Sequence, residues 1–181
     1  MRSIINEKNL NKKKILLRLD LNVPLDEGKI IDPTRIDKIL PPLNFLIKEK
    51  AKIIILSHVG RPKGKIVKEL SLKPICQELQ NKLGKKIRLI DENIKEIKNK
   101  NFFNNYNEEI FILENIRFYS EEEQNDNKFA ELLSNLGDIY VNDAFSCSHR
   151  AHTSIYKIPK FLPSFSGLQL DLEVNALNKL T

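Results

Sequence analysis

The sequence predicts an α/β protein built on an open, mostly parallel sheet. Short apolar runs alternate along the chain with amphipathic stretches, which is typical of strands separated by helices. Several runs are apolar at nearly every position, as in strands covered by helices on both faces. At 181 residues, 41% of them hydrophobic and 30% charged, the chain is long enough for one globular domain. We therefore expect a Rossmann-like, three-layer α/β/α arrangement.

The first third of the chain predicts two strands and one interrupted helix. Residues 15–21 form the first strand, because apolar side chains fill most of its positions. Residues 34–49 carry apolar residues at helical spacing, but Pro41 and Pro42 lie inside this stretch. Proline lacks an N–H and clashes with the preceding turn, so we expect the helix to break or restart there. Residues 52–57, nearly all apolar, form the second strand.

The middle of the chain predicts a second helix and a third strand. The helix covers residues 72–83, with Ser71 as the N-cap and Gly84 at the end. Residues 87–90 form the third strand. The polar, asparagine-rich stretch 93–107 predicts a short helix followed by a surface excursion.

The last third of the chain predicts two more strands and two helical segments. The strands cover residues 109–114 and 138–142, and a helix over residues 121–136 connects them. Residues 155–166 contain two prolines and predict a loop. Residues 167–181 predict a final helix.

The net charge of +6 has two components. Lysine supplies most of the 30 Lys and Arg residues, and the chain is also rich in Asn and Ile. This bias indicates codon composition rather than an anionic partner. The seven arginines are more informative, because only arginine offers a planar fork of donors to a carboxylate or phosphate. They are Arg2, Arg18, Arg35, Arg61, Arg88, Arg117 and Arg150.

The composition excludes several classes of protein. No apolar run approaches the roughly 18 residues of a membrane-spanning helix. The first residues become polar and lysine-rich without the apolar stretch of a secretory signal. Cys76 and Cys147 have neither the spacing of a zinc site nor the number of a disulfide framework. We therefore expect a cytoplasmic chain with reduced thiols and no metal site.

Polar residues gather where the predicted strands end. Asp20 and Asn22 follow the first strand and share one face of an extended chain. Dense polar segments also follow the strands at 52–57, 109–114 and 138–142. In open α/β sheets, ligands bind beyond the carboxyl ends of the strands. Four arginines lie in or beside these segments, which favours a small polyanion as ligand: Arg35, Arg61, Arg117 and Arg150.

Other functional motifs are weaker. The segment 60–65 resembles a phosphate-binding loop, but three residues rather than four separate its glycines, and Ile66 follows the lysine. No dinucleotide-binding glycine pattern, GxSxG elbow or HExxH pair is present. The histidines lack metal spacing, and no motif places a serine nucleophile beside Asp20. The lysines lack the interleaved aromatic residues of a nucleic-acid groove. A metal centre, a hydrolase and a nucleic-acid-binding protein therefore have little support.

Five segments, in this order, resemble the phosphoglycerate kinase family: RLDLNVPLDEGKIIDPTRI, ILSHVGRPKGK, ELSLKPI, LENIRFYSEEEQND and VNDAFSCSHRAHTS. The resemblance extends over essentially the whole chain. It implies one lobe of a monomeric, two-lobed cytoplasmic enzyme of glycolysis. In that family the amino-terminal lobe binds 3-phosphoglycerate or 1,3-bisphosphoglycerate, and the carboxyl-terminal lobe binds Mg-ADP or Mg-ATP.

The resemblance also implies roles for individual residues. Asp20 and Asn22 would hold the glycerate hydroxyl and its surroundings. Arg35 would reach the carboxyl or acyl-phosphate end of the substrate as the catalytic residue. Val59 and Gly60 would contribute backbone contacts. The 3-phosphate would be held by a basic patch made of His58, Arg61, Arg117 and Arg150.

One local feature departs from the family pattern. Residues 146–148 read Ser-Cys-Ser, where Gly-Thr-Ala is frequent in the family. All of these residues are small, so we expect Arg150 still to be presented to the ligand. For His149 and His152 two roles are possible: contact with the ligand, or support of the loop alone.

The larger departure is that nothing here matches the family's glycine-rich nucleotide segment. We expect residues 1–170 to form the 3-phosphoglycerate-binding domain and residues 171–181 to begin the helix that leads to a hinge. The nucleotide-binding lobe would lie outside this chain, which alone would bind no cofactor and be inactive. The alternative is a stand-alone phospho-anion-binding or regulatory module derived from this half. We expect no nucleic-acid or membrane partner.

Overall fold

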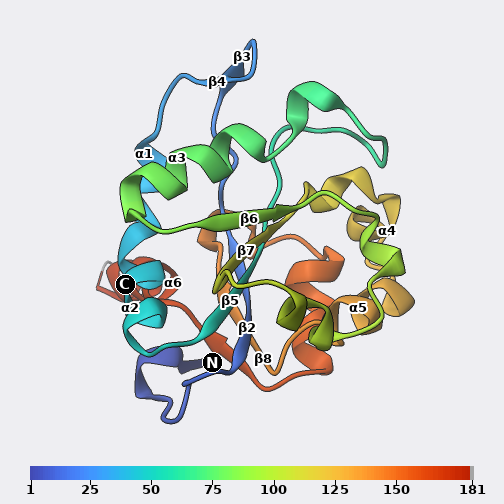
Figure 1. Ribbon diagram of the computed structural model, residues 1–181. Helices are drawn as coiled ribbons and strands as arrows, with labels where there is room; N and C mark the ends of the chain where they lie inside the picture. The colour runs from blue at the N-terminus through green and yellow to red at the C-terminus, as the bar shows by residue number, and fades with distance from the viewer. Residues whose placement is uncertain (180–181) are drawn as a thin grey trace.

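The computed structural model describes residues 1–179 and confirms the parallel α/β sheet (Figure 1). All neighbouring strand pairs of the seven-stranded sheet are parallel. Across the sheet, the strands follow the order β1 (Arg2–Ser3), β9 (Ser164–Ser166), β8 (Ile139–Asp143), β2 (Lys14–Leu19), β5 (Lys52–Leu56), β7 (Ile110–Leu113) and β6 (Ile87–Ile90). A separate antiparallel hairpin consists of β3 (Leu25–Asp26) and β4 (Lys29–Ile30).

Helices cover both faces of this sheet, as predicted (Figure 1). One face carries α1 (Thr34–Lys38), α2 (Leu40–Lys48), α3 (Lys73–Leu83) and α6 (Leu168–Asn178). The other face carries α4 (Ser120–Glu123) and α5 (Asn127–Ser134). The result is the three-layer arrangement expected from fully apolar strands.

Two apolar cores lie on the two sides of the sheet. Leu17 of β2 belongs to the core under α2 and α3, and its register partners Ile55 and Val141 share that core. The preceding residue, Leu16, points to the opposite core under α5, together with Ile54. All of these side chains are buried. Successive residues of a strand point to opposite faces of the sheet. A central strand that lies between two cores therefore needs apolar residues on both faces.

The helix expected over residues 34–49 does break, but before the prolines. α1 ends at Lys38, and α2 begins at Leu40. Pro41 and Pro42 therefore lie in the first turn of α2. A backbone N–H in this turn has no acceptor within the helix, so a proline there loses no hydrogen bond. Their position thus favours a new helix rather than a kink.

The other long helix and the predicted loop are corrected by the structure. Residues 121–136 form two helices, because the chain turns at Asn125, where φ is +54°, and Asp126 accepts a 2.7 Å hydrogen bond from Phe129 N to start α5. Residues 155–166 are not a loop. They contain helical turns up to Lys160 and then strand β9, which pairs with β8 and β1.

The two ends of the described chain lie on neighbouring elements. β1 is paired with β9 alone, and the Ser3 hydroxyl donates a hydrogen bond to Asp171 in α6. The domain boundary expected at residue 170 lies inside α6, and it stays a prediction. Positions 180 and 181 of the expected final helix lie outside the described residues. Over residues 1–179, no helix is both long enough and apolar enough to cross a bilayer.

The core on the α5 side generates a prediction for stability. Phe111 is fully buried there and contacts Phe103 edge to face, with ring centroids 4.9 Å apart. Replacing Phe111 by Ala should lower the free energy of unfolding by about 3–5 kcal/mol, since it removes apolar contacts and leaves a cavity. Urea denaturation monitored by circular dichroism measures this change. Ile66→Ala is the control, because Ile66 is 82% exposed. Equal destabilisation by the two substitutions would contradict the assignment of this core.

Candidate functional site

A cavity of about 240 Å³ opens at the carboxyl ends of β2, β5 and β8. Residues from five separate segments line it: Asp20, Asn22, Arg35, His58, Gly60, Arg61, Arg117, Ser146, Cys147 and Arg150. The structure thus brings together every residue expected at the site except Val59. Four guanidinium groups face one carboxylate, so the cavity carries a net positive charge. Such a lining suits a small polyanion.

Three larger hollows contain no arginine. One, of about 480 Å³, lies at the opposite end of the strands and is lined by four lysines and two glutamates. A second, of about 490 Å³, lies beneath the β3–β4 hairpin and contains Glu27 and Glu69 but no basic residue. The third, of about 430 Å³, mixes Lys68 with Asp91 and Glu114. Only the smaller cavity combines arginines from distant segments, so we take it as the candidate binding site.

Hydrogen bonds between loops hold the floor of the cavity. Asn22 Oδ1 accepts a 2.9 Å bond from Gly60 N, which ties the loop after β2 to the loop after β5. Ser57 Oγ accepts from Leu21 N at 3.1 Å and donates to Leu19 O at 2.8 Å, which ties the same loops a second time. Gly60 has a φ of +65°, and a Cβ there would lie 2.7 Å from Leu70. A residue with a Cβ at position 60 would therefore strain the backbone at this positive φ and displace the Leu70 side chain.

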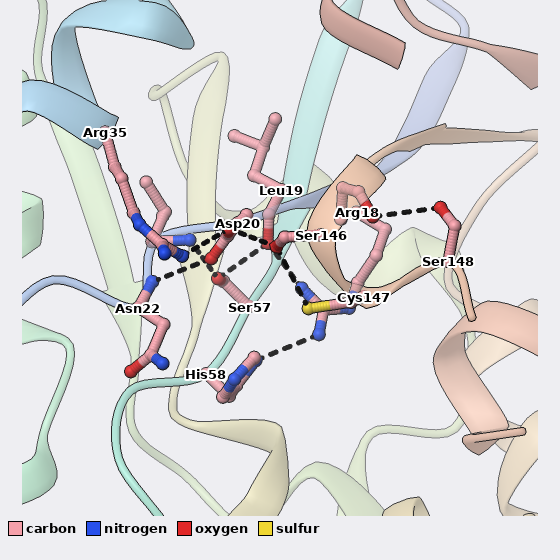
Figure 2. A network of polar contacts seen from close by, with 12 residues as sticks. Arg18, Leu19, Asp20, Asn22, Arg35, Ser57, His58, Ser146, Cys147 and Ser148 are labelled. Atoms are coloured by element: carbon pink, nitrogen blue, oxygen red, sulfur yellow. Dashed lines mark hydrogen bonds and ion pairs between the residues drawn. The ribbon is translucent and has the colours of Figure 1, made fainter. Parts of the chain in front are cut away.

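Asp20 is the acidic centre of the site (Figure 2). Its Oδ2 accepts hydrogen bonds from Arg35 Nη1 and from the Ser146 hydroxyl. Its Oδ1 accepts from Asn22 N at 3.2 Å. The Arg35 side chain is 47% exposed, whereas that of Asp20 is only 16% exposed. Asp20 thus tethers an otherwise solvent-facing arginine to the rim of the cavity.

Arg117 is the most deeply placed arginine of the lining. It is 3% exposed, and its Nη1 donates to Gly60 O at 3.4 Å. Its Nε is buried without a hydrogen-bond partner. Burial, together with the charges of Arg18 and Arg150, lowers the pKa of Arg117. A buried guanidinium with an unused donor is costly, and an anion in the cavity would compensate its charge.

His58 is a neutral donor rather than part of the positive charge. Burial and the neighbouring Arg18 and Arg117 lower its pKa to about 2. Arg18 Nη2 lies 3.0 Å from His58 Nδ1 (Figure 2). A guanidinium can only donate, so Nδ1 must be the acceptor and the ring proton must lie on Nε2. His58 therefore offers an Nε2–H group to a ligand.

Arg18 and Ser146 were not among the residues expected at the site. Arg18 is 1% exposed and lies behind His58 rather than in the lining. After Lys14 at its start, Arg18 is the one charged residue in strand β2, and a charge among apolar strand residues is the signal that could have identified it. Ser146 lines the cavity from the segment already recognised as unusual.

Val59, His149 and His152 lie away from the lining. The Val59 side chain is buried in the core under α2 and α3, and its carbonyl accepts a 2.8 Å bond from Asn115 Nδ2. His149 is exposed. The His152 carbonyl accepts hydrogen bonds from Ile155 N and Tyr156 N, which supports the following helical turn.

The donor set of the cavity does not fit a divalent cation. Mg²⁺ is bound by oxygen ligands, chiefly carboxylates, phosphates and water. The cavity offers one carboxylate, already bonded to Arg35, among four positively charged groups. Within residues 1–179, no group of three or more His, Cys, Asp or Glu side chains is arranged to hold a metal ion.

Asp143 lies beside the site, between β8 and the start of α6. Its Oδ1 accepts a 2.8 Å bond from Leu170 N, whereas Oδ2 is buried without a partner. A Cβ at Gly167 would lie 2.3 Å from Asp143 Cγ, so only glycine allows this approach. Burial raises the pKa of Asp143 to about 6.

The fold and the cavity together define a class of protein: an open-sheet α/β protein with an arginine-lined cavity at the carboxyl ends of its strands, suited in charge to a small anion. Residues 5–181 match the family model described as phosphoglycerate kinase. The chain belongs to the phosphoglycerate kinase family.

Curated relatives and solved structures agree with this family. The chain is 46% identical over 175 residues to a phosphoglycerate kinase from Bartonella bacilliformis, and the match covers 97% of this chain and 44% of the relative. It is 48% identical over 171 residues to one from Wolbachia pipientis wMel, covering 94% of this chain and 43% of the relative. The structure of phosphoglycerate kinase from Coxiella burnetii matches with a TM-score of 0.87 and 37% identity, over 98% of this chain and 44% of that chain. The chain therefore spans less than half the length of these relatives.

The environment of His58 generates a prediction for pH dependence. Its folded-state pKa lies below the ordinary 6.5, so below pH 6.5 the unfolded chain binds a proton that the folded chain excludes. This contribution to stability is present above pH 6.5 and is lost as the pH falls. His58→Gln should therefore reduce the loss of unfolding free energy between pH 6.5 and pH 4.5, measured by urea denaturation. His149→Gln, at an exposed histidine, is the control and should leave the slope unchanged.

The raised pKa of Asp143 predicts the opposite dependence of stability on pH. Its folded-state pKa is raised from 3.8 to about 6, so its contribution to stability is present below pH 3.8 and lost as the pH rises through 6. Compared with wild type, Asp143→Asn should gain about 2 kcal/mol of unfolding free energy on going from pH 4 to pH 7. Denaturant titrations at both pH values measure this difference, with the exposed Asp26→Asn as control. Parallel pH profiles of wild type and Asp143→Asn would refute it.

Proposed function

We propose that this chain supplies the 3-phosphoglycerate-binding half of a phosphoglycerate kinase. The reaction is the reversible transfer of a phosphoryl group between 1,3-bisphosphoglycerate and ADP, giving 3-phosphoglycerate and ATP. The observation that carries the proposal is the arginine-lined cavity, in a chain of this family, with Arg117 buried and incompletely paired. The ligand expected there carries a phosphate and a carboxylate, both of which pair well with arginine.

The site residues divide into two groups by position. Arg61, Arg117, Arg150 and the Nε2–H of His58 would hold the 3-phosphate. Asp20 and Asn22 would orient the hydroxyl, with Gly60 offering its backbone. Arg35, held at the rim by Asp20, would neutralise charge at the carboxyl or acyl-phosphate end as the catalytic residue. The half-exposed side chain of Arg35 leaves it free to exchange Asp20 for substrate.

The chemistry requires positioning rather than a general base. In the direction that forms 1,3-bisphosphoglycerate the acceptor is a carboxylate, which is already ionised at pH 7. Transfer of a phosphoryl group depends on alignment and on neutralisation of the charge that develops. A cavity lined by arginines and a neutral histidine donor is suited to this task.

The nucleotide would be bound by a part of the enzyme that this chain does not contain. The chain covers 44% of its relative from Bartonella bacilliformis. Mg-ATP or Mg-ADP would bind to that other part, and closure of the two lobes would align the reactants and exclude water. The complete enzyme would act as a cytoplasmic monomer. The 181-residue chain alone would bind 3-phosphoglycerate without catalysing its phosphorylation.

Titration calorimetry with 3-phosphoglycerate tests the proposed site. Arg61→Ala and Arg150→Ala should each weaken binding about 10- to 100-fold, because each removes a charge-assisted pairing worth about 1.5–3 kcal/mol. Raising the salt concentration should weaken wild-type binding as well. Arg2→Ala is the matched control, since the Arg2 side chain is 81% exposed and absent from the cavity lining. A wild-type chain that fails to bind at millimolar ligand would refute the site, and ATP-dependent turnover by this chain alone would refute the need for a second lobe.

A further inference from the structure

A buried carboxylate lies behind the cavity and is not used by the proposed reaction. Glu122, in α4, has an exposed fraction of 0%. Its Oε2 accepts a 2.9 Å hydrogen bond from Ser154 N, and its Oε1 accepts a 2.5 Å bond from the Ser154 hydroxyl. Both oxygens act as acceptors, which is the pattern of an ionised carboxylate. Burial raises the pKa of Glu122, and the charge of Arg18 together with the bonds from Ser154 offsets only part of this rise.

Ser154 connects this carboxylate to Arg18. The Ser154 hydroxyl accepts a 2.9 Å bond from Arg18 Nε, and its one hydrogen is donated to Glu122. Arg18 also donates to Leu19 O through Nη1 and to His58 Nδ1 through Nη2. Because a guanidinium only donates and a carboxylate only accepts, the direction of every bond in this series is determined.

The hydrogen-bonded series Glu122–Ser154–Arg18 also balances the positive charge of Arg18. Arg18 is 1% exposed, and a buried guanidinium without a compensating anion would be costly. Glu122 supplies the negative charge, with the Ser154 hydroxyl between the two ions. The pair is therefore neutral as a whole and leaves His58 neutral beside it.

We propose that Glu122 and Ser154 are positioning residues that hold Arg18 against His58 and so keep the ring proton of His58 on Nε2, facing the ligand. This inference rests on the proposed function, since His58 is taken as a contact for the 3-phosphate. If Arg18 were released, Nδ1 could carry the proton instead, and Nε2 would then repel an anion rather than donate to it.

Glu122→Gln is the sharpest test because it changes polarity with little change in shape. The amide of glutamine has one acceptor atom, whereas Ser154 presents two donors, its N–H and its hydroxyl. If the amide oxygen faces the N–H, the amide nitrogen donates to the hydroxyl oxygen, and the hydroxyl hydrogen loses the acceptor that Glu122 provides. If the amide is turned round, its nitrogen faces the Ser154 N–H, donor against donor, so one donor is unpaired in either orientation. Glu121→Gln is the matched control, because Glu121 in the same helix is paired with Lys95 at the surface.

The experiment is a long-range ¹H–¹⁵N correlation of the His58 ring in the full 181-residue chain, together with titration of 3-phosphoglycerate. Wild type and Glu121→Gln should show neutral His58 with its proton on Nε2. Glu122→Gln should shift the ring nitrogens towards a tautomer mixture and weaken binding about 3- to 10-fold. In a His58→Gln background, the effect of Glu122→Gln on binding should disappear, which loss of structure alone would not produce.

The possible failures are distinguishable. Unchanged ring nitrogens and unchanged binding in Glu122→Gln would overturn the positioning role while leaving the proposed function intact. A shifted tautomer in a chain whose wild type does not bind 3-phosphoglycerate would overturn the proposed function and support the positioning role. If Glu122→Gln does not fold, Ser154→Thr and Ser154→Ala replace it. The threonine variant retains a hydroxyl and should preserve the Nε2 tautomer, and the alanine variant should lose it. The same tautomer in both variants would overturn the proposal.

Discussion

Positive charge buried at one end of a parallel sheet is the constraint on which the rest of the structure depends. Arg18 and Arg117 are 1% and 3% exposed, where an isolated guanidinium would cost several kcal/mol. The protein balances the first with Glu122 through Ser154. It leaves the Nε of the second, a residue of the cavity lining, without a partner. The charge of Arg18 is thus compensated within the fold, whereas Arg117 adds positive charge to the cavity lining.

The loops of the site are held by neutral hydrogen bonds, and this keeps the arginines available. Asn22, Ser57 and Asn115 connect successive loops through backbone N–H and C=O groups. These bonds use no guanidinium. Only Arg35 is engaged by an acidic residue of the cavity, and that residue, Asp20, is itself expected to contact the substrate. The guanidinium groups of the other three lining arginines therefore stay available to a ligand.

The sequence allowed the sheet and most of the cavity to be predicted, because both depend on local patterns. Continuous apolar runs identified β2, β5, β6, β7 and β8, and polar segments at their ends identified the lining. β1 and β9 are two and three residues long, too short for any periodicity, and they exist only through their pairing. The contact between Glu122 and Ser154 joins residues 32 positions apart. No spacing rule predicts such a contact, so the sequence alone does not place Glu122 or Ser154 behind the site.

The position of β1 at the edge of the sheet has a consequence for the order of folding. Among the described strands, β1 lies earliest in the chain, yet its one neighbour in the sheet is β9, more than 150 residues later. The central strands and their helices can assemble while the first residues still have no strand to join. β1 can therefore join the sheet only once β9 is in place, although a short segment alone separates it from β2 along the chain.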